Sequence, residues 1–174
     1  MAFWLNLIGY QLVWLASVYF AANGRPIIGM AVAGAFVLAQ LAFSRQRGND
    51  ARLVVAALAA CLLIDGALAG SGWLHYASDD AGWIAPAWML ALWAAFAMTW
   101  NHSLTFLRGR LAWAVAFGAL GGPLAYAGAA RGFDAVQFNA PVWRAVLVLA
   151  VAWAIAMPLL AALSSPRAPA VVPG

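Results

Sequence analysis

The chain has 174 residues, of which 67% are hydrophobic and 8% are charged, whereas a soluble domain is about 45–50% apolar and about 25% charged. Too few polar side chains are present to cover a globule in water, so the composition excludes a soluble protein and predicts an integral membrane protein. The net charge of +4 comes from arginines that stand singly or in short loops between apolar runs, which excludes a nucleic-acid partner because no basic face can hold its backbone.

Six apolar runs are each close to the roughly 20 residues that a helix needs to cross a bilayer. In chain order they are Phe3–Ala22, Ile27–Phe43, Leu53–Leu74, Ala87–Leu107, Leu111–Ala130 and Val142–Leu163. The sequence therefore predicts an all-α fold, a polytopic bundle of about six transmembrane helices that forms one domain over residues 1–163. Residues 164–174 contain three prolines and are expected to form a disordered cytoplasmic tail.

The arginines predict the orientation of the bundle, because basic residues concentrate in cytoplasmic loops. With the N-terminus inside, the inner side holds Arg45, Arg47, Arg52, Arg108, Arg110 and Arg167, whereas the outer side holds Arg25, Arg131 and Arg144. We therefore expect both termini in the cytoplasm.

Asp65 is an acidic residue inside the third apolar run. It lies about 18 Å from the inner end of that run, close to the middle of the membrane. A carboxylate at this depth faces the bundle interior, finds a partner or takes up a proton. Two interpretations stay open, a functional acid and a neutral aspartic acid that is hydrogen-bonded to a neighbouring helix.

A second group of polar residues lies in the inner half of the fourth run, where Asn101, His102 and Ser103 follow one another. His102 lies about 7 Å below the inner surface, and a neutral imidazole there is a candidate general base. If their helices turn inward, the polar residues at similar depth form one ligand-binding cluster with His102: Asn6, Gln11, Gln40, Asn101, Ser103 and Asp65. The alternative is that each residue is a hydrogen-bonding contact between helices.

Arg108 and Arg110 flank this group and are candidates to hold an anionic lipid headgroup, or else act only as topology determinants. No metal site and no cofactor are expected, because the chain contains two histidines, one cysteine and five aspartates. In the fifth run, Gly121, Gly122 and Pro123 weaken the helix. They predict either a kink with close glycine packing or a broken helix that lines a cavity.

Several of these segments together resemble an uncharacterised family of small bacterial inner-membrane proteins known only as a domain of unknown function. The segments are Asn6–Gln11 with Trp14, Asp65-Gly66, Asn101-His102-Ser103-Leu104 and Gly121-Gly122-Pro123-Leu124-Ala125-Tyr126. The resemblance implies a multi-pass protein of the bacterial inner membrane. It also implies a part in membrane lipid modification or the envelope stress response, although the family is not assigned a particular activity.

The leading hypothesis is a protein that binds a lipid or an apolar metabolite in a groove open to the inner leaflet and assists lipid modification. Whether it is an enzyme stays open, with His102 and Asp65 as the candidate catalytic residues. One alternative is a small-solute or proton-coupled carrier that protonates Asp65. The other is a structural subunit that packs on another inner-membrane protein or on a second copy of the chain.

Overall fold

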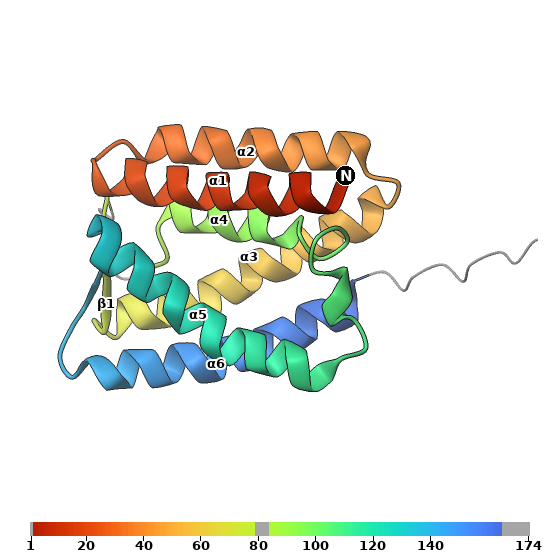
Figure 1. Ribbon diagram of the computed structural model, residues 1–174. Coiled ribbons are helices and arrows are strands. Elements are labelled where there is room, and N and C mark those ends of the chain that lie inside the picture. Colours follow the sequence, from red (N-terminus) through yellow and green to blue (C-terminus); the bar gives the residue numbers. More distant parts are fainter. Residues whose placement is uncertain (1, 79–83, 165–174) are drawn as a thin grey trace, which may run out of the picture.

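The computed structural model of the protein describes residues 2–78 and 84–164, which form six α-helices and a small two-stranded sheet (Figure 1). The helices are α1 (Ala2–Ala22), α2 (Pro26–Phe43), α3 (Arg47–Gly70), α4 (Ala87–Ala97), α5 (Leu111–Phe133) and α6 (Val142–Leu163). A 3-10 turn, η1 (Thr105–Leu107), precedes α5, and β1 (Leu74–Tyr76) pairs antiparallel with β2 (Val136–Phe138). The predicted all-α bundle is confirmed, whereas the predicted tail lies outside the described residues from residue 165 onward.

The two ends of the bundle differ in composition (Figure 1). One end, called here the arginine end, holds the start of α1, the end of α6, and the loops at residues 44–46 and 108–110. The other, the strand end, carries β1, β2 and the α1–α2 turn, where Gly24 adopts a left-handed φ of 70° and Pro26 opens α2. Both ends of the described chain thus lie on one side, as the alternation of apolar runs predicts.

Five helices, of 18 to 24 residues, are long and apolar enough to cross a membrane. Their outward faces carry large apolar side chains with nothing to cover them, such as Leu5, Ile27 and Leu63, which are each more than two-thirds exposed. Exposed apolar surface on this scale is stable only in contact with hydrocarbon. The structure is therefore that of a multi-pass membrane protein.

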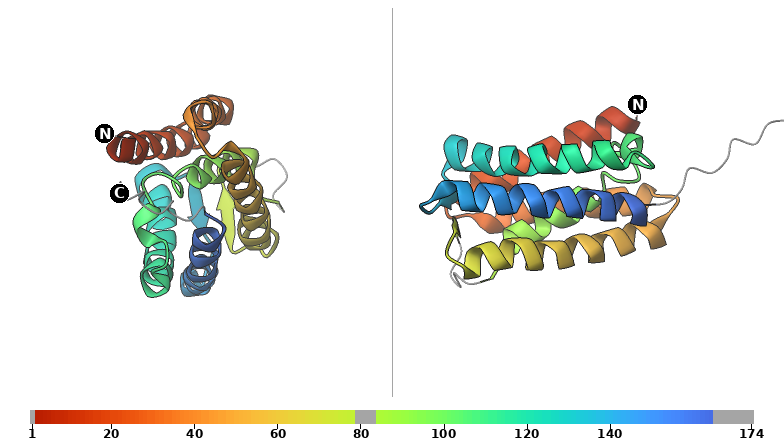
Figure 2. Two further views of the ribbon diagram at one scale, coloured as in Figure 1. Left: turned by 90° about the vertical axis from the view of Figure 1, so that its right-hand side faces the viewer. Right: turned by 90° about the horizontal axis from the view of Figure 1, so that it is seen from below.

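Helix α4 departs from the predicted span Ala87–Leu107, because it ends after 11 residues at Ala97. It lies inside the bundle in contact with α1, α2 and α3 (Figure 2), and seven of its residues are buried. Beyond Ala97 the backbone tightens, and the hydroxyl of Thr99 donates to the Phe96 carbonyl at 2.6 Å. A threonine that bonds to the backbone in this way competes with the regular helix ladder, which the apolar pattern alone does not reveal.

Helices α5 and α6 pack closely at two glycines. A Cβ atom on Gly118 would lie 2.1 Å from the backbone oxygen of Trp153, and one on Gly122 would lie 2.4 Å from the Trp153 ring. Helix α5 runs unbroken through Pro123. Of the two sequence-based alternatives for this segment, the structure therefore has close glycine packing and not a broken helix.

Candidate functional site

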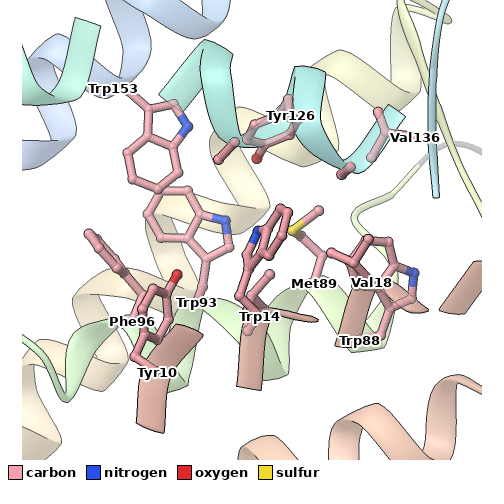
Figure 3. Close-up of a pocket in the computed structure, with 13 residues that line it drawn as sticks. Tyr10, Trp14, Val18, Trp88, Met89, Trp93, Phe96, Tyr126, Val136 and Trp153 are labelled. Carbon is pink, nitrogen blue, oxygen red and sulfur yellow. The ribbon is translucent and has the colours of Figure 1, made fainter. Parts of the chain in front are cut away.

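Two adjoining hollows lie between α1, α4, α5 and α6, and together they are called here the aromatic groove. Figure 3 shows the residues that line the inner hollow. The inner hollow has an empty volume of about 450 Å³ and the outer one about 860 Å³, counting its open mouth. Five residues line both hollows: Tyr10, Trp14, Phe96, Ala125 and Trp153.

The mouth of the groove faces sideways and not toward either end of the bundle. The outer hollow is bordered by Phe117 and Leu124, which are 50% and 69% exposed on the lipid-facing side of α5. Across the gap lies α1, which touches α5 at few points. Gln11, one of the ligand-binding residues predicted from the sequence, lines the outer hollow from α1 and is exposed. The outer hollow therefore opens on a side of the bundle that carries exposed apolar residues.

Stacked aromatic rings build the wall of the inner hollow. The rings of Trp93 and Trp153 are stacked with centroids 4.5 Å apart at 27°, and Phe96 meets Trp153 edge-on at 5.5 Å. Trp153 lies flat against α5 because Gly122 has no side chain. Offset-stacked and edge-to-face pairs of this kind are favourable, so the three rings support one another in this wall.

Asp65 lies directly behind this wall and is fully buried. Its carboxylate accepts a hydrogen bond from the Tyr76 hydroxyl at 2.9 Å, one from the Trp93 indole nitrogen at 2.9 Å, and one from the Tyr126 hydroxyl. Trp93 and Tyr126 are also lining residues of the groove. Three donors from β1, α4 and α5 thus converge on one carboxyl group of α3, which ties those elements to α3.

Asp65 lies closer to the strand end than the sequence indicates. Helix α3 begins at Arg47 and ends at Gly70, so Asp65 is about 7 Å from the end of the helix that lies at the strand end. The first turn of α3 holds Asp50, which is also fully buried although the sequence places it in a charged loop. Asp50 accepts hydrogen bonds from the hydroxyl of Ser44 and the amide of Asn101.

The residues that the sequence groups around His102 partly come together, at the arginine end. Asn6 donates to the Met98 carbonyl at 3.1 Å and accepts from the Ser103 hydroxyl at 2.7 Å. Arg108 donates to the Trp100 carbonyl at 2.8 Å and to the side chain of Asn101. These side chains satisfy backbone carbonyls that the early end of α4 leaves without a helical partner, and an unpaired buried carbonyl is costly.

The structure separates the other predicted residues from this group. Asp65 follows Asp50 by 15 residues on α3, which is about 22 Å along the helix. Gln40 lies on α2, which contributes no residue to either hollow. Arg110 is exposed and borders a third hollow, between the start of α5 and the end of α6. The structure therefore divides the predicted cluster into three parts. These are a polar cluster at the arginine end, Asp65 with its hydrogen-bond donors, and Gln11 in the aromatic groove.

His102 lies in the irregular segment after α4, outside the five long helices. Its Nε2 atom is buried without a hydrogen-bond partner among the described residues. Burial lowers the pKa of His102, the nearby Asp50 carboxylate raises it and the Arg108 guanidinium lowers it, with a net decrease. The imidazole is thus neutral at physiological pH.

Sequence reasoning missed the partners of Asp65, namely Tyr76, Trp93 and Tyr126. A signal for them exists: a buried carboxylate needs donors, and in apolar runs only tyrosine, tryptophan and a few small polar residues supply them. Nothing in the sequence shows which of the ten tryptophans and four tyrosines lie close enough.

The model of a family described as a protein of unknown function (DUF2878) matches residues 3–159. No curated protein and no solved structure matches the chain.

Proposed function

Because the chain belongs to the DUF2878 family, whose function is unknown, its role has to be argued from its geometry, and we propose that it binds a membrane lipid or another apolar metabolite in the aromatic groove. The observation that carries the proposal is the sideways mouth of the groove between α1 and α5. A site for a water-soluble ligand needs a path to one end of the bundle, whereas this one opens to the bilayer.

The depth of the groove supports a hydrocarbon ligand. Trp153 is the twelfth of the 22 residues of α6, and Gly122 is the twelfth of the 23 residues of α5. Both lie near the midplane of the hydrocarbon core, which is about 30 Å thick. Acyl and isoprenoid chains occupy this depth, and aromatic walls favour them by dispersion and by burial of apolar area.

The arginine end provides the orientation in this proposal. Arg45, Arg108 and Arg110 lie at the end that holds both ends of the described chain, so that end faces the cytoplasm of a bacterial inner membrane. In this setting the protein presents or holds a lipid while it is modified, or protects the envelope under stress. Because His102 lies at the arginine end and not on the groove wall, the proposal assigns it no catalytic step.

The proposal is tested by filling the groove. Ala125→Trp places a large side chain where both hollows meet, and Gly121→Leu places one at the mouth, where the nearest atom to an added Cβ is 3.9 Å away. Leu120→Trp is the matched control, because Leu120 is 66% exposed on the same helix and lines neither hollow. We measure binding of the fluorescent fatty acid cis-parinaric acid to purified protein in lipid nanodiscs.

We expect saturable binding by the wild type and by Leu120→Trp, and at least a tenfold loss of affinity for the two groove variants. Lipid mass spectrometry of a deletion strain complemented with each variant extends the test to cells, where only the wild type and the control are expected to restore the lipid profile. Binding that is the same in all four proteins contradicts the proposal.

A further inference from the structure

Two polar groups on the walls of the aromatic groove have no partner among the described residues. The indole nitrogen of Trp153 is buried, and no acceptor lies within hydrogen-bond distance. Figure 3 shows this nitrogen on the edge of the ring that faces Tyr126. Gln11 lines the outer hollow, is exposed there, and its amide makes no hydrogen bond within the described part of the chain.

Both groups lie at a depth where the bilayer offers no partner. Gln11 is the tenth of the 21 residues of α1, and Trp153 is the twelfth of the 22 residues of α6. At about 1.5 Å per residue, each lies roughly 15 Å from either end of its helix. The hydrocarbon core holds almost no water, so an unpaired indole or amide there is costly unless a ligand supplies the missing hydrogen bond.

An ordinary phospholipid does not supply it. Its ester and phosphate oxygens lie at the edges of the hydrocarbon core, roughly 15 Å from the midplane, and only methylene groups lie at the depth of Trp153. The polar atom that Trp153 and Gln11 can bind therefore has to lie inside the hydrophobic part of the ligand.

We infer that the aromatic groove selects a lipid that carries an oxygen acceptor, such as a ketone, in the middle of its hydrocarbon chain, with Trp153 donating to that oxygen and Gln11 adjoining it. This inference rests on the proposed function and narrows its ligand class. The aromatic rings hold the chain on both sides of the oxygen, and the two polar side chains distinguish an oxygenated chain from a plain one.

The test compares two competitors of the same length and headgroup, 10-ketostearic acid and stearic acid, in displacing cis-parinaric acid from the wild type in nanodiscs. A net hydrogen bond is worth about 0.5–1.5 kcal/mol, so the keto acid is expected to displace the probe at a roughly two- to tenfold lower concentration. Trp153→Phe and Gln11→Leu remove the polar groups, and each is expected to reduce that ratio toward one. Trp113→Phe, at a tryptophan that is 67% exposed to lipid, is expected to preserve the ratio.

The outcomes separate this inference from the proposed function. Equal displacement by the two acids, or a ratio that survives in both Trp153→Phe and Gln11→Leu, overturns the inference but leaves the groove as a lipid site. Absence of cis-parinaric acid binding to the wild type overturns the proposed function and the inference with it.

Discussion

Trp93 donates its indole hydrogen to the carboxylate of Asp65 at 2.9 Å while its ring stacks on Trp153. One side chain thus joins the buried acid of α3 to the wall of the aromatic groove. Since Tyr126 also bonds to Asp65 and lines the groove, the acid fixes the positions of two wall residues. A change at Asp65 should therefore be visible in the groove.

Asp65→Asn is expected to lower both stability and ligand affinity. Asparagine replaces one of the two carboxyl oxygens with an NH₂ donor, which leaves a buried donor without an acceptor, at a cost of about 1–3 kcal/mol. Asp65→Ala should cost more, because all three donors then lack a partner. Thermal unfolding in detergent and cis-parinaric acid binding measure the two effects, with Tyr76→Phe as the milder single-donor control. A proton-coupled carrier gives a different result, in which Asp65→Asn folds and binds normally but loses proton flux in proteoliposomes.

Gly122→Ala is expected to destabilise the protein, because the new Cβ would lie 2.4 Å from the Trp153 ring. Overpacking of this kind typically costs about 1–3 kcal/mol. The neighbouring Gly121→Ala is the matched control, since its Cβ meets nothing closer than 3.9 Å, and alanine is there neutral or slightly stabilising because it favours the helix. Thermal unfolding in detergent checks both variants, and equal melting temperatures would show that the close α5–α6 approach does not matter.

Arg108 and Arg110 look alike in the sequence but should behave differently. Arg108 bonds to the Trp100 carbonyl and the Asn101 side chain, so Arg108→Ala leaves buried acceptors unpaired at a cost of about 1–3 kcal/mol. Arg110 is exposed at the edge of the third hollow, so Arg110→Ala should change the melting temperature little. The prediction fails if the two substitutions destabilise the protein equally.

The neutral state of His102 predicts how stability depends on pH. Burial holds the pKa of His102 below its usual value of about 6.5. The unfolded chain therefore binds a proton more readily than the folded one, and stability falls as the pH drops below about 6.5. Melting temperatures between pH 5 and 8 should show this decline in the wild type and in His75→Asn, and a weaker one in His102→Asn. A decline of the same size in His102→Asn would exclude His102 as its source.

The sequence predicts the membrane class, the number of helices and the common side of both chain ends, because each follows from apolar length and from the alternation of runs and loops. It also groups Asn6 with Ser103 and Asn101 with Arg108, and the structure joins each of these two pairs by a hydrogen bond. The early end of α4 is different, since apolar residues such as Met98 and Trp100 continue the hydrophobic run past it. Only the hydrogen bonds of neighbouring side chains reveal that break.

The aromatic groove cannot be predicted from the sequence, for a similar reason. Tyr10, Phe96 and Trp153 come from three helices, and apolar composition alone does not fix how those helices rotate about their axes. Small differences in packing decide whether an aromatic ring faces lipid or a neighbour. Gln11 illustrates this: the sequence assigns it to a cluster with His102, whereas the rotation of α1 turns it to the groove.

The central position of α4 bears on how the chain is assembled during synthesis. Its contacts are mainly with α1, α2 and α3, all of which leave the ribosome before it. All three of these partners are therefore already synthesised when α4 emerges, whereas α5 and α6, which pack mainly on each other, follow it. A chain cut after α3 would therefore lack the helix that α1, α2 and α3 all contact.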